Sequence, residues 1–337
     1  MKHAPESRRW WAHLQNLIGA AVLFGFGYYL WRHRAHFASV LDVSVLDVLV
    51  LGALVVVTWV VTSAQSWLLY RASGIRVGFW ESVVLAVATA FGNYLPARVG
   101  TIARAHYLKS IHGMRYARFV SVSGIRTVLM VVATGLAGIL GTVGIFVGGG
   151  PLSVELLLLF SALCIAPVLA WVWRPPARTE GAGRIRRILH DFAEGFAQLR
   201  ARPGISGAVL VLVMTQYASL ALRFFVAARA TGGDVPTTLL LLMAPLAALV
   251  SFTAITPGGL GLREAVMGYA SFATGTSFAN GLYVGTLDRA VLLGMMAVFG
   301  SASFLTIWTR IRRASSASLS RAGSAEESSV PTPAEED

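Results

Sequence analysis

The sequence predicts an all-α membrane protein that crosses the bilayer several times. Of its 337 residues, 55% are hydrophobic and 13% are charged, whereas an average soluble domain carries about 25% charged residues. The apolar residues occur in long runs, and a run of about 18 or more can cross the ~30 Å hydrocarbon core of a bilayer as a helix. Two of these runs are interrupted by Pro and Gly at corresponding places, which predicts two related halves.

About eight membrane segments are expected. Six long apolar segments suited to complete crossings lie at 11–31, 46–70, 117–147, 151–173, 205–230 and 281–309. Two further apolar segments, 79–113 and 237–275, are interrupted in the middle by Pro and Gly. Because Pro lacks an N–H group and Gly tolerates positive φ, a helix is expected to break at each interruption. Each interrupted segment then forms a hairpin, which either re-enters one face of the membrane or spans it twice.

Basic residues in the loops predict that both chain termini are cytoplasmic. The longest hydrophilic loop, 174–204, carries seven arginines against three acidic residues, and the positive-inside rule puts such a loop in the cytoplasm. Its apolar residues follow a helical period, which indicates an amphipathic helix lying on the inner leaflet or packed against the bundle. Basic residues before the first span and after the last one indicate the same side. The expected location is the cell (inner, cytoplasmic) membrane.

The chain is expected to divide into a membrane domain, 1–313, and a tail, 314–337. The tail is rich in Ser, Ala, Pro and Glu without apolar periodicity, so a disordered, acidic, cytoplasmic tail is expected. Within the membrane domain, the first repeat covers about 46–173 and the second about 205–309. The net charge of +12 is spread over loops between the spans, which favours anionic lipid headgroups over nucleic acid as partners.

The two interrupted segments share a sequence pattern. The first reads NYLPARVGTIAR over 93–104, and the second reads ITPGGLGLRE over 255–264. Both contain Pro-x-x-x-Gly followed within four residues by a charged side chain, and each is followed by an arginine in the next apolar span, Arg126 and Arg289. Counting the crossings puts the two hairpins on opposite faces of the membrane. The sequence therefore predicts two inverted repeats.

Broken helices inside a bilayer have a functional meaning. Broken backbone is tolerated there only when it is buried in protein or lines a wet cavity, and paired broken segments point to the midplane site of a transporter. The new helix N-termini, near Val99 and Leu260, would face this cavity with partial positive charge, which suits an anion such as phosphate. The predicted cavity-shaping residues are Asn93, Pro96, Gly100, Pro257, Gly258, Gly259 and Gly261.

Five arginines lie in or beside apolar segments, where each charge costs about 2.5–3.5 kcal/mol on insertion scales. They require partners, water or a bound anion, and Glu264 and Asp288 are the carboxylates expected to balance or release them. The predicted substrate-binding residues are Arg98, Arg104, Arg126, Arg263, Glu264, Asp288 and Arg289.

Simpler roles for these residues stay open. The side chains of Arg98 and Arg104 can extend to the membrane interface. Arg126 and Arg289 can form structural ion pairs. The Pro257 motif can be an ordinary helix kink with tight packing.

At the two motifs the sequence resembles the flippase-like membrane domain of bacterial lysylphosphatidylglycerol synthases, over roughly residues 10–310. The resemblance implies translocation of a lipid with a polar or charged headgroup between leaflets. Thr101 stands where the family often has Glu, and Ile125 precedes Arg126 where an acid is common. These departures leave the first repeat cationic and favour an anionic headgroup. The aminoacyl-transferring domain of the synthases has no counterpart here, so synthase activity is not expected.

The sequence thus predicts a lipid flippase or lipid transporter whose partners are membrane lipids, with a second copy of the chain or a lipid-biosynthesis protein as further partners. The alternatives are a non-transporting scaffold or regulatory membrane protein and a secondary transporter of a small soluble anion. No G-x-S-x-G, H-E-x-x-H or Walker A motif occurs, so neither an enzyme nor a cofactor or metal is expected.

Overall fold

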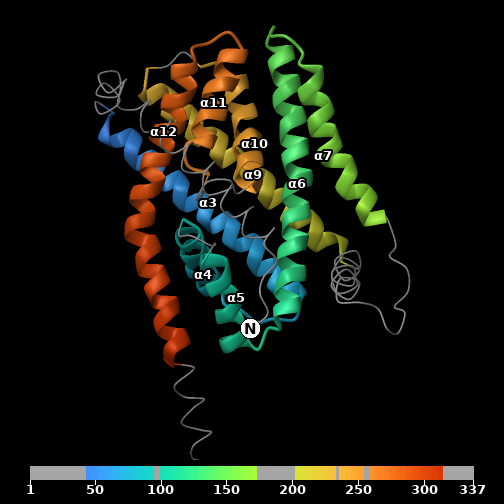
Figure 1. Ribbon diagram of the computed structural model, residues 1–337, viewed down its shortest axis with the longest axis vertical. Helices are drawn as coiled ribbons and strands as arrows, with labels where there is room; N and C mark the ends of the chain where they lie inside the picture. The colour runs from blue at the N-terminus through green and yellow to red at the C-terminus, as the bar shows by residue number, and fades with distance from the viewer. Residues whose placement is uncertain (1–42, 95–98, 173–201, 233–234, 254–258, 314–337) are drawn as a thin grey trace, which may run out of the picture.

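The computed structural model describes residues 43–94, 99–172, 202–232, 235–253 and 259–313, and within these ranges the protein is entirely helical, without a strand (Figure 1). The expected first span 11–31, most of the loop 174–204 and the tail 314–337 lie outside the described residues. The all-α class predicted from the sequence is confirmed for the part of the chain that is described.

The helices follow the expected order of spans and hairpins. In the first half they are α3 (Val45–Ala72), α4 (Phe79–Gly92), α5 (Val99–His112), α6 (Tyr116–Val147) and α7 (Val154–Val172). In the second half they are α9 (Pro203–Ala230), α10 (Thr237–Thr253), α11 (Leu262–Ala273) and α12 (Phe278–Met295), which continues through the π-helical turn η4 (Met296–Gly300).

Several of these helices are suited to a membrane. Four described helices are long and apolar enough to cross it: α3, α6, α9 and the continuous helix Phe278–Arg313. Large apolar side chains point outward from them and from α7, among them Leu140, Phe146, Leu158 and Leu305. Such a surface is stable against lipid and unstable against water. The protein is therefore a helical membrane protein with several spans, and the count of eight segments stays a prediction.

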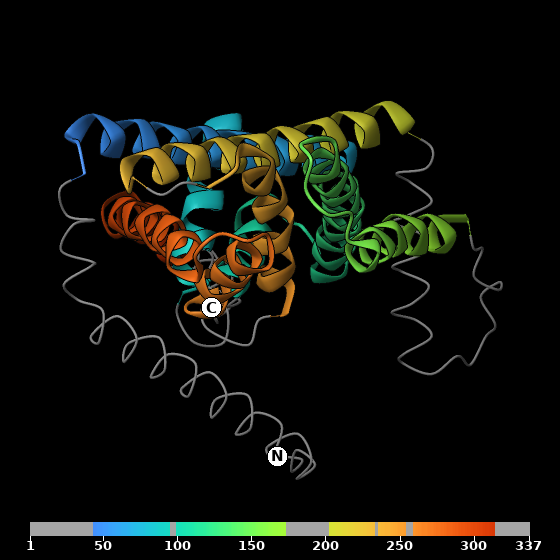
Figure 2. The same cartoon turned by 90° about the horizontal axis from the view of Figure 1, so that it is seen from above.

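Helices α3 and α9 lie side by side and antiparallel along one face of the bundle (Figure 2). The hydroxyl oxygens of Thr58 and Ser219 lie 3.1 Å apart near the middle of this pair. At its end, Arg202 Nη1 donates to the carbonyl oxygen of Ala72 at 3.2 Å. Helix α4 packs on α3, and α10 packs on α9, so each half places its hairpin against its own long helix.

The first interrupted segment breaks between α4 and α5, as the Pro/Gly motif predicts. The two helices pack closely, because a Cβ atom on Gly100 would overlap the carbonyl oxygen of Thr89 and lie 2.9 Å from the backbone nitrogen of Asn93. The side-chain oxygen of Asn93 accepts hydrogen bonds from the backbone nitrogen and the hydroxyl of Thr101, at 3.0 and 3.1 Å. Asn93 thereby caps the start of α5.

The second interrupted segment breaks between α10 and α11. Gly259 and Gly261 have φ angles of +71° and +78°, a region that favours glycine. Residues 254–258, which include the predicted cavity-shaping Pro257 and Gly258, lie outside the described residues, as do Pro96 and Arg98. Helix α11 packs on α12 within the second half. Across the halves, α10 packs on α6 and α4 packs on η4, so each hairpin also contacts the other half.

Replacing Gly100 with Ala is expected to destabilise the first hairpin by about 1–3 kcal/mol, because the added methyl group overlaps backbone atoms that cannot rotate away. The measurement is the apparent Tm of the purified protein in detergent. Gly144→Ala in α6 is the matched control, since nothing lies within 4 Å of the added Cβ atom. An unchanged Tm for Gly100→Ala would show that the α4–α5 contact is looser than described.

Candidate functional site

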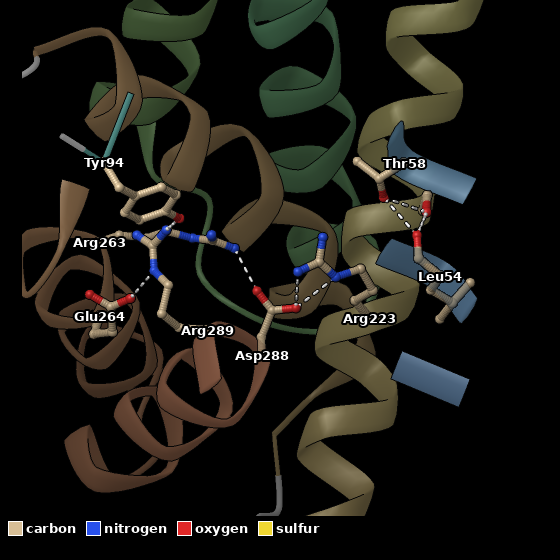
Figure 3. A network of polar contacts seen from close by, with 9 residues as sticks. Leu54, Thr58, Tyr94, Arg223, Arg263, Glu264, Asp288 and Arg289 are labelled. Carbon is tan, nitrogen blue, oxygen red and sulfur yellow. Dashed lines mark hydrogen bonds and ion pairs between the residues drawn. The ribbon is translucent and has the colours of Figure 1, made fainter. Parts of the chain in front are cut away.

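A buried carboxylate, Asp288 of α12, binds two arginines at once (Figure 3). Arg223 Nε donates to Asp288 Oδ1 at 2.7 Å, and Arg263 Nη2 donates to Oδ2 at 2.9 Å. Asp288 is fully buried, and the two arginines are 3% and 7% exposed. Because α9, α11 and α12 contribute one residue each, this triad ties the three helices together.

A second carboxylate, Glu264 of α11, has two roles. Its Oε2 accepts a hydrogen bond from the backbone nitrogen of Gly261 at 2.8 Å, which caps α11. Its Oε1 accepts from Arg289 Nε at 3.0 Å. Glu264 therefore both caps α11, the helix after the break, and binds Arg289 of α12.

The two broken hairpins meet at Arg289. Its Nη1 donates to the hydroxyl oxygen of Tyr94 at 2.7 Å, and Tyr94 directly precedes the break of the first hairpin. The other nitrogen, Nη2, would lie 3.7 Å from a Cβ atom on Gly259, at the break of the second hairpin. Tyr94 and Gly259 lie far apart in the sequence, each beside one Pro/Gly motif. Both lie next to the guanidinium group of Arg289.

We name this group the arginine–carboxylate cluster and define it as Arg223, Arg263, Glu264, Asp288 and Arg289. Aromatic rings cover two of its guanidinium groups: the Phe224 ring centre lies 5.3 Å from Arg263, and the Tyr94 ring centre lies 5.8 Å from Arg289. Three positive and two negative groups leave a formal charge of +1. Most of the charge is balanced inside the protein, as a buried site requires.

Sequence reasoning missed Arg223. It lies inside the apolar segment 205–230, and its neighbours Leu222 and Phe224 are apolar. The signal that singled out Arg126 and Arg289, an arginine deep within a span, applies equally to Arg223. Unlike Arg126 and Arg289, however, Arg223 does not lie in a span that follows a Pro/Gly motif, and only the fold brings it to the second hairpin.

The arginines of the first half lie in a different environment. Arg104 Nε donates to the hydroxyl oxygen of Tyr70 at 2.7 Å, and Arg126 Nε donates to Gln65 Oε1 at 3.2 Å. Gln65 Nε2 in turn donates to Gln216 Oε1 of α9 at 2.9 Å. Tyr70 and Gln65 lie five residues apart on α3, so Arg104 and Arg126 bind neighbouring turns of the same helix. We name these five residues the arginine–amide cluster.

The partners in the arginine–amide cluster are neutral. Within the described ranges, neither Arg104 nor Arg126 forms an ion pair with a carboxylate. Arg104 is 9% exposed, and its side chain points to Tyr70. In the same ranges, no group of three His, Cys, Asp or Glu side chains could hold a metal ion.

The predicted site residues therefore fall into two groups. Arg263, Glu264, Asp288 and Arg289 lie together, and Arg104 lies with Arg126. The positions of Arg98, Pro96, Pro257 and Gly258 lie outside the described residues. Substrate binding by any of these residues stays a prediction.

Replacing Asp288 with Asn is expected to destabilise the protein by roughly 3–5 kcal/mol, because two buried guanidinium groups lose their counter-charge. Thermal unfolding in detergent measures the loss, and adding Arg223→Gln to the same variant is expected to restore part of it. Glu155→Gln, at an exposed carboxylate on α7, is the control. Equal Tm values for Asp288→Asn and Glu155→Gln would contradict the assignment of Asp288 as the centre of the cluster.

The family resemblance predicted from the two motifs is confirmed by comparison with known families. A comparison with curated proteins gives no match. The family model described as the lysylphosphatidylglycerol synthase TM region matches residues 16–300, which include both broken hairpins and both arginine clusters. The chain belongs to the family of this transmembrane region.

Proposed function

We propose that this protein moves a lipid with an anionic headgroup between the leaflets of the cell membrane. The observation that carries the proposal is the contact between Arg289 and Tyr94, which brings the ends of two broken hairpins together around buried arginines. Broken helices that meet in this way are typical of the substrate sites of membrane transporters. The family supports a lipid as substrate, because the matched model describes the membrane region of synthases named for a phospholipid.

The short helices of the hairpins support re-entrant segments. Helices α4 and α5 have 14 residues each, which corresponds to about 21 Å at about 1.5 Å per residue. This length is less than the ~30 Å hydrocarbon core of a bilayer. We therefore infer that the hairpin enters and leaves on one face, so that its break lies within the membrane, where a headgroup has to pass.

Two inverted repeats, about 46–173 and 205–309, are part of the proposal. In a structure with an inverted repeat, residues that lie at the pseudo-two-fold axis meet their own counterparts. Ser219 follows Thr58 by 161 residues, the same separation as that of Pro257 from Pro96, and the hydroxyl oxygens of Thr58 and Ser219 lie 3.1 Å apart. The antiparallel pairing of α3 with α9 supports an axis through this contact.

The proposed orientation has both termini in the cytoplasm. Arg202 is the N-cap residue of α9, so its contact with the end of α3 brings the start of α9 to the face at which the first hairpin begins. Arg310 Nη1 donates to the hydroxyl oxygen of Tyr107 at 3.3 Å, so the end of the last span lies near the end of α5. These basic ends lie together, as the positive-inside rule requires of cytoplasmic loops.

Leaflet-resolved transport in proteoliposomes tests the proposal. Fluorescent phosphatidic acid, phosphatidylglycerol and phosphatidylcholine are supplied to one leaflet, and the fraction that reaches the other is measured with a membrane-impermeant quencher. The two anionic lipids are expected to move faster than in empty liposomes and to be recovered chemically unchanged. If no lipid moves faster than in empty liposomes, the flippase proposal fails. The scaffold would then be favoured, or the soluble-anion transporter if radiolabelled phosphate accumulates in the same vesicles.

Tyr94→Phe is expected to slow this transport by about tenfold, because it removes the hydroxyl group that joins the hairpins while the ring stays in place; a hydrogen bond to a charged group contributes about 1.5–3 kcal/mol. Tyr269→Phe is the matched control, since Tyr269 is exposed on α11. Equal rates for the two variants would show that the contact between the hairpins has no part in transport.

A further inference from the structure

The two halves of the protein neutralise their buried arginines in different ways. In the arginine–carboxylate cluster, Asp288 and Glu264 accept hydrogen bonds from all three arginines. In the arginine–amide cluster, the acceptors are the hydroxyl group of Tyr70 and the amide of Gln65. A neutral acceptor orients a guanidinium group without cancelling its charge, so two positive charges remain close together in the first half.

The sequence explains this difference. In the second half the carboxylate of Asp288 directly precedes the arginine of the last span, whereas Ile125 precedes Arg126 in the first half. At the separation of 161 residues between the two motif prolines, the counterparts of Glu264 and Asp288 are Ala103 and Thr127. Neither of these first-half positions carries an acid.

Some hydrogen-bond donors of the arginine–amide cluster are not used within the described part of the protein. Arg104 and Arg126 each use only Nε, and their Nη nitrogens donate no hydrogen bond to any residue that the structure describes. None of these Nη atoms is among the buried polar atoms that lack a hydrogen bond. The free Nη groups of the first half therefore reach accessible space.

Neutral side chains hold Arg126 in place. Gln65 accepts from Arg126 and donates to Gln216 Oε1, which also accepts from the hydroxyl group of Thr62 at 3.3 Å. Tyr70 accepts from Arg104, so its own hydroxyl hydrogen is available to another acceptor. The cluster is therefore a set of oriented donors around two charges, which is the arrangement that binds a tetrahedral oxyanion.

We propose that Arg104 and Arg126, with Tyr70, form a binding site for a phosphate monoester group, and that the arginine–carboxylate cluster supports transport by holding the two broken hairpins together without binding the phosphate itself. Two uncompensated arginines match the charge of about −1.5 to −2 that a phosphate monoester carries at neutral pH. A phosphate diester carries only one negative charge and balances half of the cluster. The assignment of this group to a lipid headgroup rests on the proposed function; a free phosphate would present the same chemistry.

Ligand-induced stabilisation of the full-length protein in detergent tests the site. The probes are short-chain phosphatidic acid, short-chain phosphatidylcholine and inorganic phosphate, and the readout is the rise in Tm with ligand concentration. Wild type is expected to respond saturably to phosphatidic acid and not to phosphatidylcholine. Arg126→Gln and Arg104→Gln are each expected to weaken the Kd for phosphatidic acid by about tenfold or more, with Arg126→Lys in between because it keeps the charge without the planar fork.

The Tm of each variant without ligand shows whether the substitution disturbs the fold. Because Arg104 and Arg126 repel each other, neutralising either one is expected to leave the ligand-free Tm unchanged or raised. Arg118→Gln is the matched control, since Arg118 is exposed on the same helix as Arg126. Wild-type affinity in both Arg104→Gln and Arg126→Gln would overturn the site, and so would an equal loss in Arg118→Gln, which would indicate attraction by surface charge alone.

Comparison of the probes separates this inference from the proposed function. Tighter binding of phosphatidic acid than of inorganic phosphate supports a lipid as the source of the phosphate group. Equal binding supports the site but assigns it to a free anion, which counts against lipid transport. If wild-type protein transports lipid while Arg126→Gln binds and transports as well as wild type, the proposed function stands and this site fails.

Discussion

The structure depends on one buried carboxylate, Asp288, which holds two arginines from different helices. Burying three charges carries a large desolvation cost, which the attraction between them offsets only when each hydrogen bond is made. Helices α9, α11 and α12 therefore have to pack so that Arg223 and Arg263 reach both oxygens of Asp288. The neighbouring residue, Arg289, extends the same constraint through Tyr94 to the first hairpin. Such a network determines how the helices pack against one another more than it adds to the net free energy of folding.

The two halves of the membrane domain differ in how the charge of their buried arginines is balanced. A repeated backbone pattern, a long helix with a broken hairpin against it, carries balanced charge in one half and unbalanced charge in the other. A symmetric protein with two enclosed clusters would have no place for an anion. A protein with two open clusters would carry a large uncompensated charge in the bilayer. The second half balances most of its buried charge with its own carboxylates, and under the proposal a charged headgroup balances that of the first half.

Much of the fold could be predicted from the sequence because its signals are local. Apolar length predicts the spans, and the two Pro/Gly motifs predict where α4 and α10 end. Which side chains pair with each other depends on the fold. Successive residues on a helix point about 100° apart, so the neighbours Asp288 and Arg289 bind different partners. Sequence spacing alone does not reveal these partners. Arg223 lies far from both motifs in the sequence, and its contact with Asp288 arises only from the packing of α9 on α12. Neutral partners such as Gln65 and Tyr94 have no sequence signature, since these residue types occur in many apolar helices.

The most direct test of the account is a structure of the protein determined by electron cryo-microscopy in nanodiscs that contain phosphatidic acid. The account predicts density for a phosphate group within hydrogen-bond distance of Arg104 and Arg126, together with an arginine–carboxylate cluster that contains no ligand. Lipid density confined to the outer surface of the helices, with only water beside Arg104 and Arg126, would contradict it.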